Sequence, residues 1–428
     1  MPIDQNFLFP VVPNWSSPVK QTISFKTDIF TTRAGVEFRR AARLKPRQRY
    51  EFTGLMRRGG HEDALRRAMA RGHEPLAFIM PPYRAEMDGY WGSYTGASPQ
   101  VIEHRGFYAY SDIIPYFTAD IDPYVVQSLP EGLVLNRASS YAGGTINLED
   151  DLVAGSTAEL QEKYPLGSYI YRAAMTPFYD LSRMQQMTRE STIVDVAYEI
   201  IADDENDYDN YIPASDDYQN GSAAQLHNLI EVFTAEPNWK TPLAKGISPM
   251  TARSDFGFGR VQLDTYYDHI PLTQELTFLQ RDWDSAMELI GFFMRMRGRQ
   301  GEFFIPSRMN DMRLSADVAD GGTQIIVENS DWADFDLSNV HRHICWRDAS
   351  GALHTAQVDD MIASSRTTFD LSAGVTGGIS KADTPYIDWL YPARLATDEL
   401  TVEWITEEYA QLVLPIRVIP DRSWTPPE

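Results

Sequence analysis

The sequence is poor in cysteine, in long apolar runs and in cationic residues. Its one cysteine, Cys345, excludes an internal disulfide framework and every zinc site that needs several thiolates. The longest apolar runs, such as Leu412–Ile416, are far too short to cross a bilayer. The N-terminal stretch has no basic region followed by an apolar core, which argues against a secretory signal. We therefore expect a soluble protein made in a reducing cytoplasm, without a membrane span.

Cationic residues are outnumbered by acidic ones, with 38 Lys and Arg against 60 Asp and Glu and a formal net charge of −22. This balance argues against a protein that mainly holds free nucleic acid or binds anionic membranes. The 428 residues predict two or three domains, and 43% hydrophobic residues are enough for sizeable cores. Aromatic residues at 12%, with 26 prolines and 27 glycines, favour a chain rich in strands and turns.

The chain contains an internal repeat at an offset of 224 positions. The tripeptide Pro-Asn-Trp at 13–15 recurs at 237–239. An ungapped comparison of 13–55 with 237–279 gives 11 identities in 43 positions, where background residue frequencies would give about three. The repeat indicates one module of under 200 residues that is written twice.

Apolar spacing gives the content of each half. One helix is predicted per half, at 62–71 and 283–297, and the rest is mostly strands. The predicted strands are 21–29, 48–53, 76–80, 192–201, 259–267, 273–278, 302–305, 324–328, 341–346, 355–361, 400–405 and 410–419. The fold class is therefore mainly β (α+β), an internally duplicated β-sandwich or barrel module with a packed helix in each copy.

The domain boundaries follow from the repeat. Residues 1–202 form the first module, with an insertion at about 83–130 that is rich in tyrosine, proline and glycine. Residues 203–236 form an acidic linker, followed by a short helix at about 223–233. Residues 237–428 form the second module, with an extra sheet at about 324–390.

Two patterns could hold a metal ion, and both have a plainer interpretation. Four carboxylates alternate between Asp203 and Asp209, but this stretch lacks the glycine and glutamate positions of a helix–loop–helix calcium site, and a solvated linker accounts for it. His341, His343 and Cys345 share one strand face without an evident fourth ligand; ordinary sheet core accounts for the cysteine, and a solvated face accounts for the two histidines. We expect no metal and no cofactor.

No catalytic pattern stands out. The sequence has no Gly-x-Ser-x-Gly elbow and no Gly-x-x-x-x-Gly-Lys phosphate loop. Carboxylates are abundant, but their spacing singles out no acid–base pair. We expect a protein that is not an enzyme.

The most unusual charge feature is a basic segment from Arg33 to Arg71. It holds twelve cationic residues against four acids, a local charge of +8, so the rest of the chain carries −30. Such a segment can dock an acidic neighbour, for instance another copy of this chain, since complementary patches set register and partner choice. A solvated surface accounts for it equally well, and contact with DNA phosphates is a third interpretation. The candidate docking residues are Arg33, Arg39, Arg40, Arg43, Lys45 and Arg47.

The first repeat resembles a known family. The segment DIFTTRAGVEFRRA at 28–41, followed by RQRYE at 47–51, resembles the T-x-x-G-x-E-x-R-x-A … R-x-x-Y opening of tail-tip proteins from long-tailed phages. The segment FFMRMRGRQGEFF at 292–304 resembles their FF-x-x-R-x-G-x-x-x-x-F helix-to-strand element. The resemblance covers about 80 residues of each half. At the offset of 224, Leu263 and Asp264 replace Arg39 and Arg40, so the second half lacks the basic run.

The resemblance implies a structural virion protein. Similar proteins form the distal-tail ring and baseplate hub of siphophages and of phage-like gene transfer agents. It implies a tail-tube-like module, assembly in the host cytoplasm, and contacts with the tail tube protein, other baseplate or hub proteins, the tape measure and a receptor-binding fibre. DNA would pass only in transit. No catalytic residue is carried over.

Tail tubes are sixfold rings of one module, and the tip tapers to threefold symmetry, as the resemblance implies. A chain with two modules can close a pseudo-sixfold ring as a homotrimer, in which unlike halves alternate. One alternative is a hexameric distal tail protein. Another is a tail-associated carbohydrate-binding module or hydrolase, in which Tyr90, Trp91 and Tyr94 of the insertion would contact a glycan or a fibre.

Overall fold

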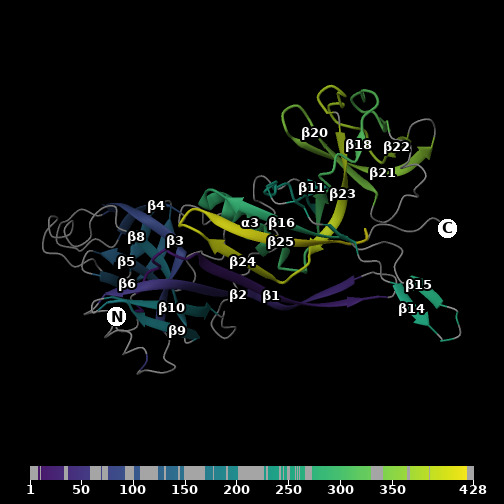
Figure 1. Cartoon of the computed structure of the whole chain (residues 1–428). Coiled ribbons are helices and arrows are strands. Elements are labelled where there is room, and N and C mark those ends of the chain that lie inside the picture. The colour runs from purple at the N-terminus through teal and green to yellow at the C-terminus, as the bar shows by residue number, and fades with distance from the viewer. Residues whose placement is uncertain are drawn as a thin grey trace.

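Strands dominate the computed structural model, shown in Figure 1. The residues that the structure describes are 8–9, 11–32, 37–57, 69, 76–91, 101–106, 124–129, 132–142, 145–148, 169–176, 178–188, 191–200, 226–227, 230–240, 242–243, 245–247, 251–255, 257, 259, 261–265, 272–328, 341–363, 367–384 and 386–421. They hold twenty-five strands and the helix α3. The protein is therefore mainly β, as the composition predicted.

The first half contributes four antiparallel strands to a large sheet. In spatial order they are β1 (Val19–Thr31), β2 (Glu37–Arg57), β10 (Ser191–Ile200) and β9 (Tyr179–Gln186). Alternate residues of β1 and β10 are buried, which is the period expected of strands with one face on a core. The first half thus uses its first two and its last two strands for this sheet.

The second half contributes four antiparallel strands in the same order. They are β13 (Lys245–Ile247), β16 (Leu272–Gln280), β25 (Ala410–Val418) and β24 (Glu399–Trp404). A separate hairpin, β14 (Thr251–Asp255) with β15 (Val261–Thr265), follows β13 in the chain and projects from the molecule (Figure 1). In both sheets, therefore, the first strand lies at one edge and the next-to-last strand at the other.

The two sheets also share their pairing. Positions 21 and 50 face each other in the first sheet, and positions 245 and 274 in the second, so both partners are shifted by 224 (245 − 21 and 274 − 50). Past the irregularity in β1, positions 27 and 41 are matched by 251 and 265, again shifted by 224. Positions 194 and 184 are matched by 412 and 402, both shifted by 218 (412 − 194 and 402 − 184).

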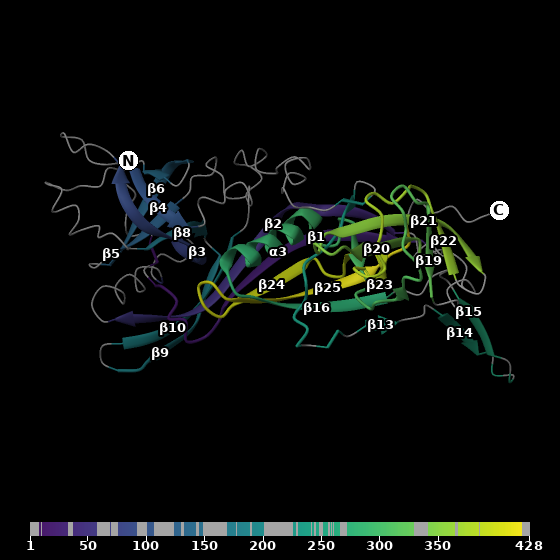
Figure 2. The same cartoon turned by 90° about the horizontal axis from the view of Figure 1, so that it is seen from above.

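The two sheets are joined edge to edge. Strand β1 pairs antiparallel with β24 over Val19–Ser24 and Glu399–Trp404. The result is a continuous order β13-β16-β25-β24-β1-β2-β10-β9, in which the halves lie side by side (Figure 2).

A closed six-stranded barrel extends from the first half, at the left in Figure 1. Its strands are β3 (Leu76–Trp91), β4 (Val101–Gly106), β7 (Thr145–Leu148), β6 (Gly132–Ala142), β5 (Tyr124–Leu129) and β8 (Tyr169–Thr176). The predicted insertion at about 83–130 supplies the end of β3 together with β4 and β5. The barrel therefore occupies the chain between the second and the last two strands of the first sheet.

The second half carries its own addition between equivalent strands. Strands β17 (Phe303–Pro306), β18 (Met312–Arg313) and β20 (His343–Arg347) pair with β23 (Tyr386–Leu395). Beyond β20 lie β21 (Leu353–Ala363), β22 (Thr367–Leu371) and β19 (Gln324–Val327). These strands enclose a second apolar core around Trp389 and Phe369, and they lie in the region where an extra sheet was expected, at about 324–390.

Helix α3 (Trp283–Met296) covers one face of the large sheet (Figure 2). Asp282 caps its N-terminus by accepting a hydrogen bond from the Ser285 backbone N–H at 2.8 Å. Arg297 and Gly298 end it with left-handed φ angles of 49° and 64°. Its buried face joins residues of both sheets in one core.

The predicted strands within the described residues are confirmed, and so is the helix at 283–297. The short helix at 223–233 was wrong: the described residues there form a hairpin of β11 (Leu226–His227) and β12 (Ile230–Glu231). Val232 bridges to Phe304, so pairing with β17 satisfies the backbone of this segment in place of helical bonds. The helix predicted at 62–71 lies outside the described residues except for Met69. Among the described residues, no helix is long and apolar enough to cross a membrane.

Candidate functional site

The junction between the two sheets is the best-defined polar site in the described part of the chain. Buried Gln21 on β1 lies at its centre and bonds to side chains of three other strands. Its amide donates to the hydroxyls of Tyr50 at 3.0 Å and Tyr83 at 2.8 Å, and its carbonyl accepts from the Trp404 indole at 3.0 Å. Because an unsatisfied buried amide is costly, this network fixes how β1 sits against β24.

A buried ion pair ties the start of β2 to β23. Arg394 donates from Nε and from a terminal nitrogen to the two carboxylate oxygens of Glu37, at 2.6 and 2.9 Å. Both side chains are at most 5% exposed. Burial alone would raise the pKa of Glu37, but the hydrogen bonds and charge of Arg394 outweigh it and hold that pKa below its ordinary value.

Asp398, just before β24, collects four donors from both halves. It accepts from the backbone N–H and the hydroxyl of Thr27 at 2.8 and 2.9 Å, and from the backbone N–H and Nε of Arg299 at 2.8 and 3.0 Å. The left-handed turn at the end of α3 aims Arg299 at this carboxylate. Burial would raise the pKa of Asp398, yet these hydrogen bonds lower it overall, so the carboxylate is ionised at neutral pH.

The basic segment lies largely on β2, and its described side chains contact groups of the same chain. Arg39 is only 3% exposed and donates to the carbonyls of Gln300 and Gly301, at 3.1 and 3.2 Å, and to the carboxylate of Glu302. Arg39 therefore contacts an acidic residue in the other half of the same chain, and docking of this segment on a separate partner stays a prediction.

The remaining candidate docking residues differ in exposure. Arg43 is half-buried and donates to the carbonyl and hydroxyl of Ser24 at 3.1 and 3.3 Å. Arg47 is exposed and faces Glu199 at 3.6 Å, and Arg40 is exposed opposite Asp28 on β1. The Lys45 side chain and all of Arg33 lie outside the described residues. Docking through Arg40 and Arg47 stays a prediction.

The aromatic candidates belong to the barrel. Tyr90 and Trp91 lie at the end of β3, opposite Ile102 and Val101 of β4. Only the backbone is described at these two positions, and Tyr94 lies outside the described residues. Their role in glycan or fibre contact stays a prediction.

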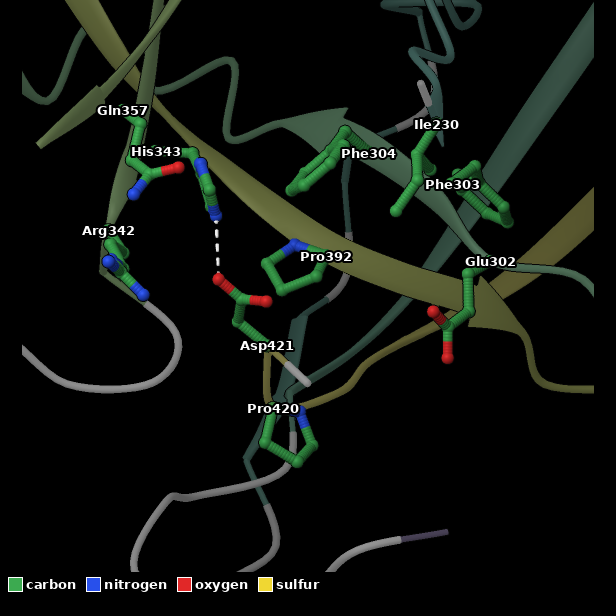
Figure 3. Close-up of a pocket in the computed structure, with 10 residues that line it drawn as sticks. All are labelled: Ile230, Glu302, Phe303, Phe304, Arg342, His343, Gln357, Pro392, Pro420 and Asp421. Atoms are coloured by element: carbon green, nitrogen blue, oxygen red, sulfur yellow. Dashed lines mark hydrogen bonds and ion pairs between the residues drawn. The ribbon is translucent and has the colours of Figure 1, made fainter. Parts of the chain in front are cut away.

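A pocket of about 390 Å³ opens between β17, β20, β21 and the segment after β25 (Figure 3). Figure 3 shows Asp421 pointing at His343, whose Nε2 lies 2.9 Å from the carboxylate. The other nitrogen of His343 lies 2.8 Å from Nε2 of His227, and Nδ1 of His227 lies 3.0 Å from the Thr355 hydroxyl. Four side chains from three parts of the sequence thus form one polar chain.

Burial and the neighbouring His343 lower the pKa of His227 to about 4, so this imidazole is neutral at neutral pH. A neutral ring has one N–H, so His227 donates in one of its two ring contacts and accepts in the other. The chain of contacts attaches the β11–β12 hairpin and Asp421 to the second-half sheet. Its evident role is to hold these segments in place.

The metal patterns do not converge in the described residues, where no group of three or more His, Cys, Asp or Glu is arranged to hold an ion. The ring of His341 packs on Trp389 and Tyr391, whereas His343 faces the pocket. Cys345 is buried, and burial raises the pKa of its thiol. The acidic stretch from Asp203 to Asp209 lies outside the described residues.

Sequence reasoning missed the residues that build the junction. Gln21 and Trp404 occur in ordinary alternating strands, and Glu37 is one of the few acids beside a basic run. The one signal was Glu37 itself, an acidic residue within a cationic segment. Nothing in the sequence identifies Arg394 or Asp398 as partners of the first half.

No protein-family model matches this chain, and no curated protein matches its sequence.

Proposed function

We propose that this chain is a structural virion protein of the tail tip of a long-tailed phage. It forms a hub ring that joins the tail tube to the baseplate and the receptor-binding parts. Its work is packing and complementarity between subunits, without turnover of a substrate. The proposal starts from the motif resemblance at 28–51 and 292–304, and the sheet geometry supports it.

One observation carries the proposal: two four-stranded sheets with the same order and the same pairing are joined edge to edge. Equal offsets along both partners of a ladder are expected when one module has been duplicated, because each insertion shifts all following positions together. The shift of 224 holds for the first hairpin, and 218 holds for the last two strands. The duplicated module is then the four-stranded sheet, with additions between its second and third strands.

Two joined modules per chain favour a homotrimer that closes a pseudo-sixfold ring. The β1–β24 junction joins different edges, which is a head-to-tail contact, and head-to-tail contacts repeated by rotation close into rings. The halves differ in their additions, a barrel on one and a second sheet on the other, so a trimer would display each three times. A hexameric distal tail ring is the alternative assembly.

The partners in this proposal are other copies of the chain, the tail tube protein, neighbouring baseplate or hub proteins, the tape measure and a receptor-binding fibre. The barrel is a closed unit at one end of the molecule, which suits it to carry contacts outside the ring (Figure 1). A carbohydrate-binding role for the barrel is the second candidate, because the end of β3 carries two aromatic residues, Tyr90 and Trp91.

Immunogold labelling of the phage particles that carry this chain tests the location. Antibodies raised against the purified chain should label the distal end of the tail. Labelling of the capsid, or failure of the chain to copurify with particles, would overturn the proposal.

For the second candidate, binding of the chain to host-envelope glycans should fall at least tenfold in Trp91→Ala. Equal binding by the variant and the original chain would exclude that role for Trp91.

A further inference from the structure

Among the described strands, the eight-stranded order β13-β16-β25-β24-β1-β2-β10-β9 has an open edge at each end. Among the described strands, β9 pairs only with β10 and β13 pairs only with β16, and these two lie at opposite ends of the strand order. An edge strand presents main-chain donors and acceptors, which proteins cover, shorten, interrupt with proline or use for association. Strand β9 has eight residues and no proline. It is therefore suited to pair with another strand.

The two open edge strands are equivalent to the two strands that pair at the internal junction. The internal junction joins the first strand of one sheet, β1, to the next-to-last strand of the other, β24. Strand β13 is the first strand of its sheet, and β9 is the next-to-last strand of the other. We propose that β9 of one copy pairs antiparallel with β13 of a second copy, in a junction equivalent to that between β24 and β1.

The internal junction also gives the register of this contact. In it, Val19 lies opposite Trp404. Adding the shift of 224 to β1 and subtracting the shift of 218 from β24 converts that pair into Leu243 opposite Gln186. The same conversion gives Met184 opposite Lys245 and Arg183 opposite Gly246.

The chemistry of these pairs permits the contact. Arg183 falls opposite a glycine and Lys245 opposite a methionine, so no like charges face each other directly. Because β9 and β13 lie at opposite ends of the strand order, the contact is head-to-tail and can continue from copy to copy until a ring closes. The inference rests on the self-association in the proposed function, but not on the location in a phage tail.

Disulfide trapping with Gln186→Cys and Leu243→Cys tests the register. Residues opposite one another on antiparallel strands have Cα atoms about 4.5–5.5 Å apart, within the range of a disulfide. The native Cys345 is 1% exposed, so it contributes little background. A mixture of the two single variants, carrying different tags, should give disulfide-linked dimers with one of each. The double variant should give linked multimers that end at a closed ring.

Two controls match this design. Gln185→Cys with Leu243→Cys shifts the register by one residue, which turns the side chain to the other face of the strand, and its linkage should be at least tenfold lower. Lys20→Cys with Glu403→Cys lies in the internal junction, where the two residues face each other. It should form a disulfide within one chain and no multimers.

If Leu243→Cys prevents assembly under reducing conditions, Met184→Cys with Lys245→Cys tests the same register. Equal linkage of the shifted pair, or assembled rings in which neither matched pair links, would overturn the proposed junction while the ring itself remained. A chain that stays monomeric and unlinked would overturn both the junction and the ring. Specific linkage in a protein absent from phage tails would keep the junction and overturn the proposed function.

Discussion

Replacement of Glu37 by glutamine should destabilise the protein strongly. The carboxylate is 5% exposed and accepts two hydrogen bonds from Arg394, which is 4% exposed. Glutamine keeps the shape of the side chain but leaves the guanidinium buried near two further cations, Arg39 and Arg417, without its counter-charge. Removal of one member of a buried ion pair costs about 3–5 kcal/mol, a large part of a total stability of about 5–15 kcal/mol.

Urea unfolding followed by tryptophan fluorescence measures this loss, since Trp404 at the junction is fully buried. The double variant Glu37→Leu with Arg394→Met is the control, and it should recover most of the lost stability because both charges are gone. The Glu37 pKa is lowered in the folded state, so its contribution is present above pH 4.5 and is lost as the pH falls through the lowered value. A loss below about 1 kcal/mol in Glu37→Gln would refute the reasoning.

Three further changes probe other parts of the molecule. Arg39→Ala should lower the free energy of unfolding by about 2 kcal/mol, because it removes charged hydrogen bonds at a buried site, whereas the exposed Arg40→Ala should change it by less than about 0.5 kcal/mol; equal effects would contradict the described burial of Arg39. The pKa of His227 is lowered from 6.5 to about 4 in the folded state, so its contribution to the free energy of unfolding is present above pH 6.5 and is lost as the pH falls toward 4. Urea titrations at pH 7 and pH 5 should therefore show a smaller loss of stability between the two pH values in His227→Gln than in the original chain, and equal losses would contradict this assignment. Gly54→Ala should cost about 1–3 kcal/mol by overpacking, since a Cβ there would lie 2.1 Å from a Val11 methyl; an unchanged melting temperature would contradict this.

The strands were predictable from the sequence where one face is buried and the other is not. In β24 the apolar residues Leu400, Val402 and Trp404 alternate with exposed or half-buried ones, and the strand follows directly from that period. Strand β2 is longer than predicted, because its first part, around Arg39 and Arg43, has no apolar alternation to mark it. Its structure comes from pairing with β1, which the local sequence does not reveal.

The candidate site was less predictable, since its residues gain their meaning from contacts between the halves. Arg39 has the sequence setting of a surface cation, yet Glu302, more than 260 positions away, pairs with it. The segment at 223–233 has helical spacing, but the backbone of Val232 and Phe233 joins β17 instead. The offset of 224 came from sequence identities alone, whereas the joining of the two sheets through β1 and β24 needed the structure.

The copy number of the assembled ring tests the central proposal most directly. Native mass spectrometry of the purified chain should show three copies of the 48.6 kDa chain, about 146 kDa (3 × 48.6), as the dominant closed species. The six sheets of that trimer should then appear as a pseudo-sixfold ring in electron microscopy without imposed symmetry. Six copies per ring, or a chain that remains monomeric at micromolar concentration, would contradict the account.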